Sequence, residues 1–320
     1  MRSVALTAAA VCATAVLAGC SQSTAGAPSP APEPTVSAPG APQPIPRTRV
    51  SLRVPAGFMV DGRMPGLCRA GTSSGVIVVE SALHGKTPEQ AMEKMAAGLR
   101  RRPNPQGLEF DSVDRGTVAG MPAVLATGVQ RISDQTFGKT TVAFAAPDAM
   151  VIMTGTLQYG DPLPIAELSA VLRDARWGDR AAPGDLGYDI RPAPGYTRMI
   201  NSAGLSFTLG GRQEMGVPRF VVHRSASDVV LPEESRRQFA EQRFGQMPGS
   251  PAVGTINAKA VAGRSAFEIT GQSAEKGLTM YAVIVFDGKR YILMSGGFDP
   301  AKHPDQLPAF RAMADSLVIK

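Results

Sequence analysis

The sequence predicts an α+β protein built from two tandem modules, each an antiparallel β-sheet packed by helices. Three observations lead to this prediction. The second half of the chain repeats a pattern of the first, short β-branched runs follow one another through tight turns, and the helical segments stand apart from those runs. The chain has 320 residues, of which 43% are hydrophobic. That is long enough for two domains of ordinary size and apolar enough to give each its own core.

The internal repeat consists of four short matches that recur in the same order at a spacing of roughly 140 residues. They are an Arg-x-x-x-Gly-aromatic motif (Arg53, Gly57 and Phe58; Arg191, Gly195 and Tyr196), a Val-Ala-Gly turn (118–120; 261–263), a hydroxyl-Gly pair (Thr154 and Gly155; Ser295 and Gly296) and a final helical pattern (165–172; 307–314). A duplication followed by small changes in loop length explains this order. It predicts a first module over 47–178 and a second over 186–320, joined by a short segment that contains Pro and Gly.

Each predicted module has the same order of elements: two strands, a helix, a run of four strands and a closing helix. The ranges in the first module are 50–58, 76–80, 88–102, 116–119, 123–130, 140–145, 150–158 and 165–172. Those in the second are 190–196, 220–223, a helix from Pro232 anchored by Phe239 and Phe244, 258–262, 266–272, 280–286, 290–296 and 310–317. Thr87, Pro88 and Gln90 form a helix-start signal, and Asp287-Gly288 is typical of a two-residue hairpin.

The first residues of the chain form an export signal. After Met1-Arg2 comes an apolar run over 4–17, too short to cross a bilayer of roughly 30 Å and typical of a signal segment. It ends in Leu17-Ala18-Gly19-Cys20, which resembles the lipobox of bacterial lipoproteins. The resemblance implies a signal peptide over 1–19 and a mature Cys20 that carries an S-diacylglycerol and an N-acyl group. The alternative is an ordinary cleaved signal peptide that happens to contain Cys20.

The next residues predict a tether. Residues 20–46 hold the lipidated Cys20 and then eight prolines, with Glu33 as the one charged residue. Such a composition cannot bury a core and favours a semi-extended, polyproline-like chain. We therefore expect the protein at the cell membrane, on its extracytoplasmic face, and held there by lipid. Two or three acyl chains anchor a protein firmly, whereas one does so only marginally.

The order of elements resembles the Mog1/PsbP-like fold, and single copies of it are similar to lipoproteins of the mycobacterial LpqN/LpqT family. The matching residues are the Arg-x-x-x-Gly-aromatic start, the Val-Ala-Gly hairpin and the hydroxyl-Gly pair that the repeat already showed. These are turn and packing features. The resemblance implies an accessory binding role, without a shared catalytic set, and a chain that departs from the family in having two modules.

One motif suggests serine chemistry. Gly71-Thr72-Ser73-Ser74-Gly75 matches the G-x-S-x-G pattern of hydrolases, whose nucleophile needs a strand before it and a helix after it. Here a Gly- and Arg-containing loop precedes Ser73, and the β-branched run at 76–79 that follows favours a strand. The context therefore favours a turn over a nucleophile.

The remaining reactive residues form no recognisable site in the sequence. His84, His223 and His303 lack the spacing of a zinc site, so neither a metal nor a cofactor is predicted. Cys12 leaves with the signal and Cys20 is acylated, so Cys68 is left as a lone thiol without a disulfide partner. We interpret Cys68 as a buried structural residue.

Charge gives little information about partners. The formal net charge is +6, which is modest for this length and argues against nucleic-acid binding. The one basic run, Arg100-Arg101-Arg102, ends the first predicted helix, where cations complement the helix dipole. The alternative use of this run is contact with anionic lipid headgroups or an acidic envelope polymer.

These observations favour a membrane-anchored envelope lipoprotein that acts as a non-catalytic binding or accessory module for an envelope lipid or a protein partner. An apolar cleft would favour a lipid ligand, and a flat surface would favour a protein. Two alternatives stay open: a serine-type envelope hydrolase that uses Ser73 with one of the histidines, and a purely structural spacer.

Overall fold

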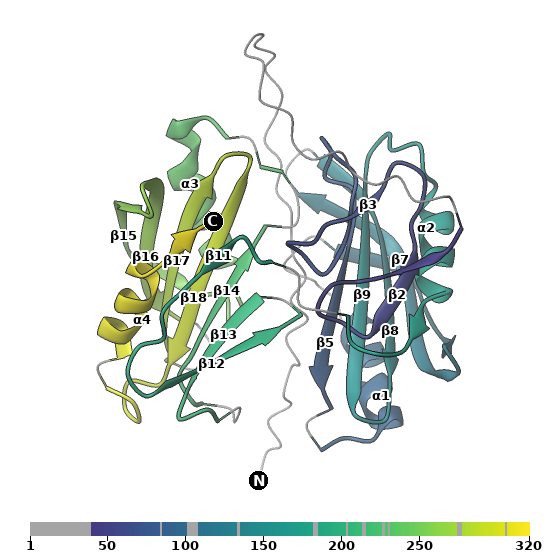
Figure 1. Cartoon of the computed structure of the whole chain (residues 1–320), viewed down its shortest axis with the longest axis horizontal. Coiled ribbons are helices and arrows are strands. Elements are labelled where there is room, and N and C mark those ends of the chain that lie inside the picture. Colours follow the sequence, from purple (N-terminus) through teal and green to yellow (C-terminus); the bar gives the residue numbers. More distant parts are fainter. Residues whose placement is uncertain are drawn as a thin grey trace.

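The computed structural model describes residues 40–83, 85–100, 108–132, 135–181, 185–202, 204–212, 216–225, 228–229, 231–273, 277–304 and 306–320. Within these ranges the chain forms two seven-stranded antiparallel sheets that lie side by side, each packed by helices (Figure 1). The predicted fold class, α+β with two tandem modules, is confirmed. Among the described residues, no helix combines the length and apolar character that crossing a membrane requires.

The two sheets have the same strand order. Across the first sheet the strands are β3 (Met59–Val60), β4 (Gly66–Cys68), β5 (Gly75–Ala82), β9 (Ala149–Gln158), β8 (Gln135–Ala145), β7 (Met121–Ile132) and β6 (Leu108–Val118). Across the second they are β12 (Tyr196–Asn201), β13 (Gly204–Leu209), β14 (Arg219–Arg224), β18 (Arg290–Phe298), β17 (Thr279–Asp287), β16 (Arg264–Gln272) and β15 (Ala252–Val261). This agreement is what the internal repeat in the sequence predicts.

A helix covers each face of each sheet. The helices are α1 (Pro88–Leu99) and α2 (Ile165–Arg173) in the first module, and α3 (Arg236–Gly245), preceded by the short 3-10 helix η1 (Glu233–Ser235), and α4 (Gln306–Asp315) in the second. Along β8, Val142 and Phe144 pack in the cluster that contains α2, while Ala143 and Ala145 pack in the cluster that contains α1. Alternate side chains of a strand point to opposite faces, so α1 and α2 lie on opposite sides of the sheet.

The start of α1 follows the signal in the sequence. The side chain of Thr87 accepts a hydrogen bond from the backbone of Gln90, and the side chain of Gln90 accepts one from the backbone of Thr87, with Pro88 in the first turn. This reciprocal pair satisfies backbone N–H groups that the first helical turn leaves without partners.

Short strands outside the main sheets close each module. In the first, β2 (Val50–Arg53) pairs with both β1 (Pro42–Pro44) and β10 (Arg176–Trp177). In the second, β11 (Tyr188–Asp189) pairs with β19 (Val318–Ile319). The beginning and end of each module are therefore held together. The structure also places the end of the range assigned to the tether in the first module, because β1 is paired there and Ile45 is fully buried in its core.

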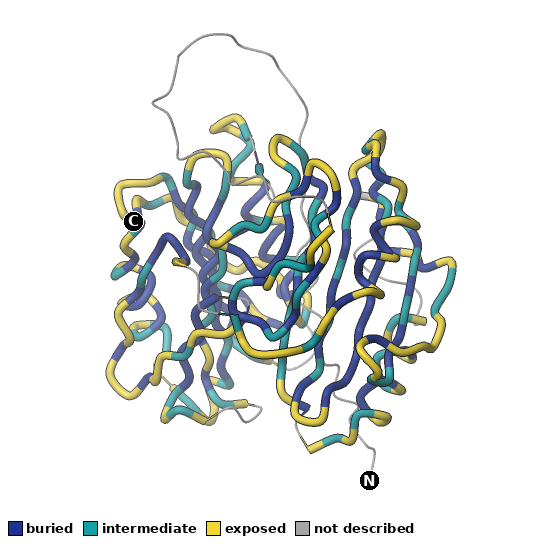
Figure 2. Tube along the Cα trace, turned by 45° about the vertical axis from the view of Figure 1, so that its right-hand side comes forward, coloured by how far each residue is buried: buried dark blue, intermediate teal, exposed yellow. Residues whose placement is uncertain are grey.

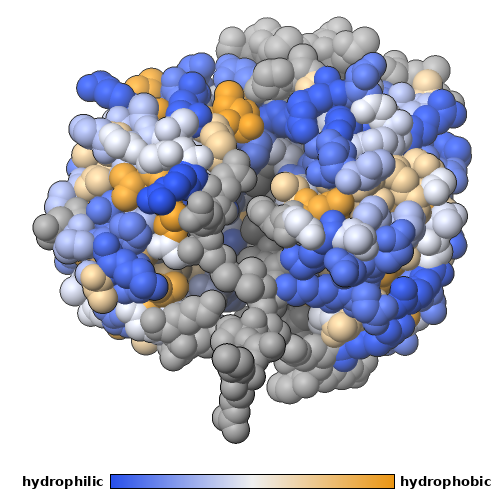
Figure 3. Space-filling view, turned by 90° about the horizontal axis from the view of Figure 1, so that it is seen from below, coloured by the Kyte–Doolittle hydropathy of each residue, from blue (hydrophilic) through white to orange (hydrophobic). Residues whose placement is uncertain are grey.

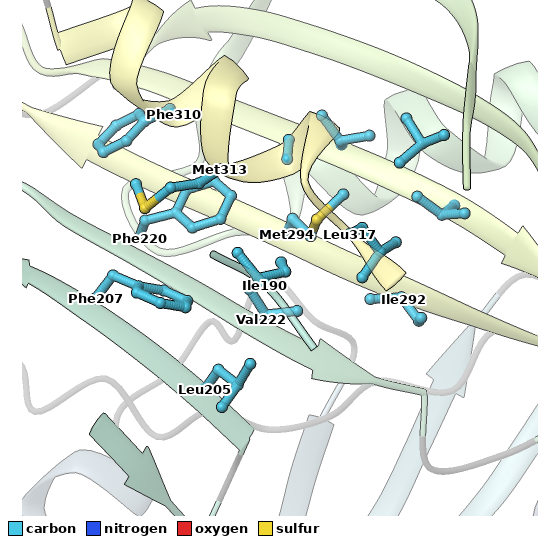
Figure 4. Packing of buried hydrophobic residues seen from close by; sticks show 14 of the residues in the cluster. Ile190, Leu205, Phe207, Phe220, Val222, Ile292, Met294, Phe310, Met313 and Leu317 are labelled. Carbon is cyan, nitrogen blue, oxygen red and sulfur yellow. The ribbon is translucent and has the colours of Figure 1, made fainter. Parts of the chain in front are cut away.

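The core of the second module is centred on Phe310 of α4. Its ring lies 5.4 Å from that of Phe220, 5.8 Å from Phe298, 6.0 Å from Tyr281 and 6.1 Å from Tyr196, measured between ring centroids. Figure 4 shows this helix lying over strands that carry Phe220, Val222, Ile292 and Met294. Figure 2 shows that the buried residues run along the middle of the strands, with exposed residues at turns and edges.

The hydroxyl-Gly pair of the repeat has a packing role. A Cβ atom on Gly296 would lie 2.6 Å and 2.8 Å from ring atoms of Phe310 and 2.9 Å from the Arg219 carbonyl oxygen. A Cβ atom on Gly155, the equivalent position, would lie 2.7 Å from Leu168 of α2 and 2.8 Å from Thr140. In both modules the closing helix thus lies directly on a glycine of the sheet.

Two strands at the edge of each sheet were missing from the prediction. These are the β3–β4 and β12–β13 hairpins, which extend each sheet beyond β5 or β14. Strand β6 also begins at Leu108, well before the predicted 116–119. The strands of the first-module hairpin have only two or three residues and β12 is mostly exposed, so none of these shows a clear alternation of apolar residues. Strand β13 does show one, because Leu205, Phe207 and Leu209 alternate with polar residues, and the sequence analysis overlooked this signal.

We predict that Gly296→Ala lowers the free energy of unfolding by about 1–3 kcal/mol, because the added methyl group displaces Phe310 and overpacks the core. Urea denaturation followed by circular dichroism measures the change. Gly98→Ala is the control, since its Cβ atom meets nothing within 4 Å on α1 and a helical alanine is favoured over glycine. Equal effects of the two substitutions would contradict close packing at Gly296.

Candidate functional site at the module junction

The candidate residues from the sequence analysis lie in different parts of the chain. Cys20, His84 and the pair Arg101-Arg102 lie outside the described residues, whereas Arg100 ends α1 and donates to the backbone carbonyl of Val113 at 2.9 Å. His223 is on β14 and His303 lies in the segment before α4. Within the described part of the chain, no group of three or more His, Cys, Asp or Glu side chains comes together as a metal site would require.

Ser73 lies in the hairpin between β4 and β5, so a strand follows it, as its sequence context predicts. The residue is 1% exposed, and its Oγ forms no hydrogen bond with the described residues. The neighbouring hydroxyl of Ser74 donates to Asp161 Oδ2 at 2.5 Å and accepts from the Gln158 backbone at 3.0 Å. The loop is thus a turn tied to the end of β9, and both of its serines are buried and not presented to a substrate.

Cys68 is half-buried on β4 rather than fully buried as expected. Burial raises the pKa of its thiol, the negative charge of Asp61 raises it further, and Arg290 acts in the opposite direction. A raised pKa keeps the sulfur protonated and weakly nucleophilic. Arg290 belongs to the second module, so this thiol lies where the two modules meet.

This meeting place contains a network of ion pairs and hydrogen bonds. We use the name module junction for Arg47, Asp61, Glu80, Arg180, Ser202, Asp228 and Arg290. Arg290 begins β18, and its Nη1 lies 2.7 Å from Asp61 Oδ2 in the turn between β3 and β4. Its Nε lies 3.3 Å from Asp228 Oδ1 of its own module. The side chains of Arg290 and Asp61 are 20% and 14% exposed, so solvent screens this ion pair only in part.

A second contact joins the turn after β12 to the first sheet. The Ser202 hydroxyl accepts from the Glu80 backbone N–H at 2.9 Å and donates to the Glu80 carbonyl at 3.3 Å. Strand β4 pairs with β5 only along Gly75–Ile77, and no other described strand pairs with the rest of that edge of β5. One hydroxyl from the second module thus satisfies two backbone groups that the first sheet leaves open.

The joint between the modules contributes its own arginine. Arg180 Nη2 lies 2.5 Å from Glu80 Oε1, and its Nη1 donates to the Arg47 carbonyl at 2.9 Å. Glu80 also pairs with Arg49 at 2.9 Å, and its side chain is only 5% exposed. Two arginines therefore neutralise one buried carboxylate, which is costly to bury without such partners.

Arg47 supports the turn that carries Asp61. It is 3% exposed, has a φ of 64°, and donates to the backbone carbonyls of Gly62 and Arg63, both at 3.2 Å. Sequence reasoning missed it, as it missed Arg290, because their partners lie far along the chain and no motif marks them. Apart from Arg47, which bonds backbone carbonyls, the charged groups of the junction form ion pairs with one another, so the junction connects the two modules through polar contacts.

Among the described residues, a shallow concavity of about 320 Å³ lies near the start of the first module. It is lined by Gly40, Pro42, Arg53, Asp174 and Arg176, and Arg53 and Asp174 form an ion pair at 3.1 Å across it. This lining is polar and charged. It suits a polar group better than an acyl chain.

No protein-family model matches the chain, and no curated protein matches it either. Among solved structures it is similar to LpqN, involved in cell envelope biogenesis of Mycobacterium tuberculosis, at 14% identity over 45% of this chain and 88% of that chain, with a TM-score of 0.33. It is also similar to a chain of the Tle4–Tli4 complex (13% identity, 86% and 96% covered, TM-score 0.28). A third similar structure is the T6SS immunity protein TplEi from Pseudomonas aeruginosa, complexed with the "L" peptide. The identity is 11%, the match covers 86% of this chain and 96% of that chain, and the TM-score is 0.26. Similarities at this level carry no argument about function.

We predict that Asp61 and Arg290 couple by about 1–3 kcal/mol in a double-mutant cycle, because the pair is partly shielded from water. The variants are Asp61→Asn, Arg290→Gln and their combination, and urea denaturation measures each. Arg53 and Asp174 form the matched control pair, since both side chains are more than half exposed and should couple by less than about 1 kcal/mol. A coupling energy no larger than that of the control pair would show that the Asp61–Arg290 ion pair does not stabilise the contact between the modules.

We predict that stability falls between about pH 6.5 and pH 4. Burial, and to a lesser degree Arg243, lowers the pKa of His223 to about 4, below the ordinary value near 6.5. In that interval the unfolded chain binds more protons than the folded chain, so the free energy of unfolding decreases as pH falls. Because His223 is half-buried, we expect a loss of about 1–3 kcal/mol, measured as urea denaturation at each pH. His223→Asn should reduce the dependence of the free energy of unfolding on pH, whereas His303→Gln should leave that dependence unchanged. If His223→Asn also leaves it unchanged, His223 is not its source.

Proposed function

We propose that the chain is a lipid-anchored protein of the cell envelope that binds a protein partner without catalysing a reaction. The anchor is supported by the sequence Leu17-Ala18-Gly19-Cys20 and by the proline-rich residues that follow it. The binding role is supported by the observation that carries the proposal: at the module junction Arg290 and Ser202 connect the two modules, and Arg180 ties the joint to the first module. A preformed surface loses little conformational entropy when a partner binds.

Two features favour a protein partner over a lipid. The space between the modules is bridged by ion pairs and hydrogen bonds, and the concavity near Arg53 and Asp174 is polar. On the face drawn in Figure 3, hydrophobic side chains form small, separate groups among hydrophilic ones, apart from the grey atoms. Surfaces of this kind suit protein contacts, whereas acyl chains need a continuous apolar lining.

We predict that the chain incorporates palmitate when expressed in a bacterium that makes lipoproteins, because the thiol of Cys20 is the expected site of diacylglyceryl transfer. Metabolic labelling with a palmitate analogue measures this. Cys20→Ser should abolish the label, and Cys68→Ser should keep it. An unlabelled wild-type chain would refute the anchor while leaving the binding role open.

We predict that crosslinking of the full chain in intact cells yields a reproducible adduct with one protein. The control is Arg290→Gln, which should reduce that adduct by loosening the arrangement of the sheets. Native mass spectrometry of the chain with envelope lipid extract tests the competing ligand. A stoichiometric lipid adduct would show that the ligand is a lipid and not a protein. If neither a protein adduct nor a lipid adduct is found, the structural spacer is the better explanation.

The serine-type hydrolase is tested separately. Because the Ser73 Oγ is buried in a turn, we expect a fluorophosphonate probe to leave the chain unlabelled. Labelling that disappears in Ser73→Ala would overturn the non-catalytic proposal.

A further inference from the structure

The two sheets end in equivalent outer strands, β6 and β15, which differ in how their open edges are protected. Strand β15 lies at the outer side of the second module, away from the first (Figure 1). Seven of its ten residues are exposed, including the large hydrophobic Val253. Its one charged residue, Lys259, is bound to Asp315 at 2.5 Å and to Glu268 at 3.4 Å, so that charge is drawn toward its own sheet.

The register shows which backbone groups of β15 point outward. Strands β15 and β16 are joined by the two-residue turn Ala262-Gly263, with both residues at positive φ, and Val261 pairs with Arg264. The pair that flanks such a turn is hydrogen-bonded, and hydrogen-bonded pairs then alternate along the ladder. Ile256, Ala258 and Ala260 therefore direct their N–H and C=O groups away from the sheet. No hydrogen bond from the described residues reaches these groups.

The equivalent strand of the first module is protected. Strand β6 has the same turn, Ala119-Gly120, so Val113, Arg115 and Thr117 occupy the outward positions. Arg100 donates to the outward carbonyl of Val113 at 2.9 Å, and β6 carries four charged residues where β15 carries one: Glu109, Asp111, Asp114 and Arg115. Charged side chains and occupied backbone groups are the usual means by which an edge strand avoids pairing with another chain.

We propose that β15 pairs with β15 of a second copy of this chain, in an antiparallel arrangement about a two-fold axis at Ala258. In that register Ala258 faces its own counterpart and Ile256 faces Ala260, so every outward group on these residues finds a partner. The side chains at the axis are small, which lets the backbones approach. Lys259 faces Asn257 of the other copy, so no like charges stand directly opposite.

This self-complementarity is the reason to choose a second copy over an unrelated peptide. Two of the three outward residues are alanine and the strand has a single charged residue, so β15 paired with itself about Ala258 meets neither steric nor like-charge conflict. The joined edges would give one continuous sheet of both second modules. The contact is small and belongs to the weak class of interfaces, so association depends on concentration.

Disulfide trapping of the full chain in intact cells tests the proposal. In a Cys68→Ser background, Ala258→Cys places two thiols on residues that face each other at a Cα separation of about 5.5 Å, within the range a disulfide spans. Arg115→Cys, at the equivalent position of β6, is the matched control. We expect a band of twice the chain mass under non-reducing conditions that is at least about fivefold stronger for Ala258→Cys than for Arg115→Cys or the parent.

A second measurement does not depend on a new thiol. Light scattering of the purified full chain in mild detergent should show a mass that rises with concentration for the wild type. Ala258→Lys should remain monomeric, because it places two like charges at the axis while leaving the β15–β16 ladder intact. Circular dichroism confirms that the variant is folded. Equal trapping at both edges, trapping of a different protein, or a wild type that stays monomeric would each overturn the proposal.

Discussion

The arrangement of the two sheets depends on one side chain that serves both modules. Arg290 bonds Asp228 within its own module and Asp61 in the other, so the residue that begins β18 also determines where the first sheet lies. Its neighbours complete the contact by a different means. Ser202 satisfies open backbone groups of β5, and Arg180 neutralises Glu80 from within the joint. The junction is thus held by polar groups whose partners would otherwise be buried without compensation.

This kind of contact explains why the fold was predictable and the junction was not. Repetition, β-branched runs and the Thr87 capping signal are local, and each leaves a pattern within a few residues of sequence. Arg290 and Asp61 are separated by 229 positions, and nothing about either residue in its local context distinguishes it from a surface charge. The same holds for Arg47, whose role depends on the turn that lies beside it in space.

The sequence motifs that could be checked proved to be features of packing. The repeated Thr154-Gly155 and Ser295-Gly296 pairs mark the places where a helix rests on a strand, and the G-x-S-x-G motif is a buried turn. The β3–β4 hairpin escaped prediction because strands of two or three residues are too short to show apolar alternation, whereas β13 carries that alternation in Leu205, Phe207 and Leu209 and was overlooked. The two modules therefore share this packing, while the outer strands β6 and β15 differ in charge and in the hydrogen bond that β6 receives from Arg100.

The pairing of the first and last strands within each module bears on how such a chain could arise. Because β2 pairs with β10 and β11 pairs with β19, each module enters and leaves its fold at the same place. A gene segment for one module can then be duplicated in tandem with only a short linker between the copies, because each copy can fold without changing the structure of the other. The architecture is, in this sense, extendable: a further unit can follow a module as readily as the second module follows the first.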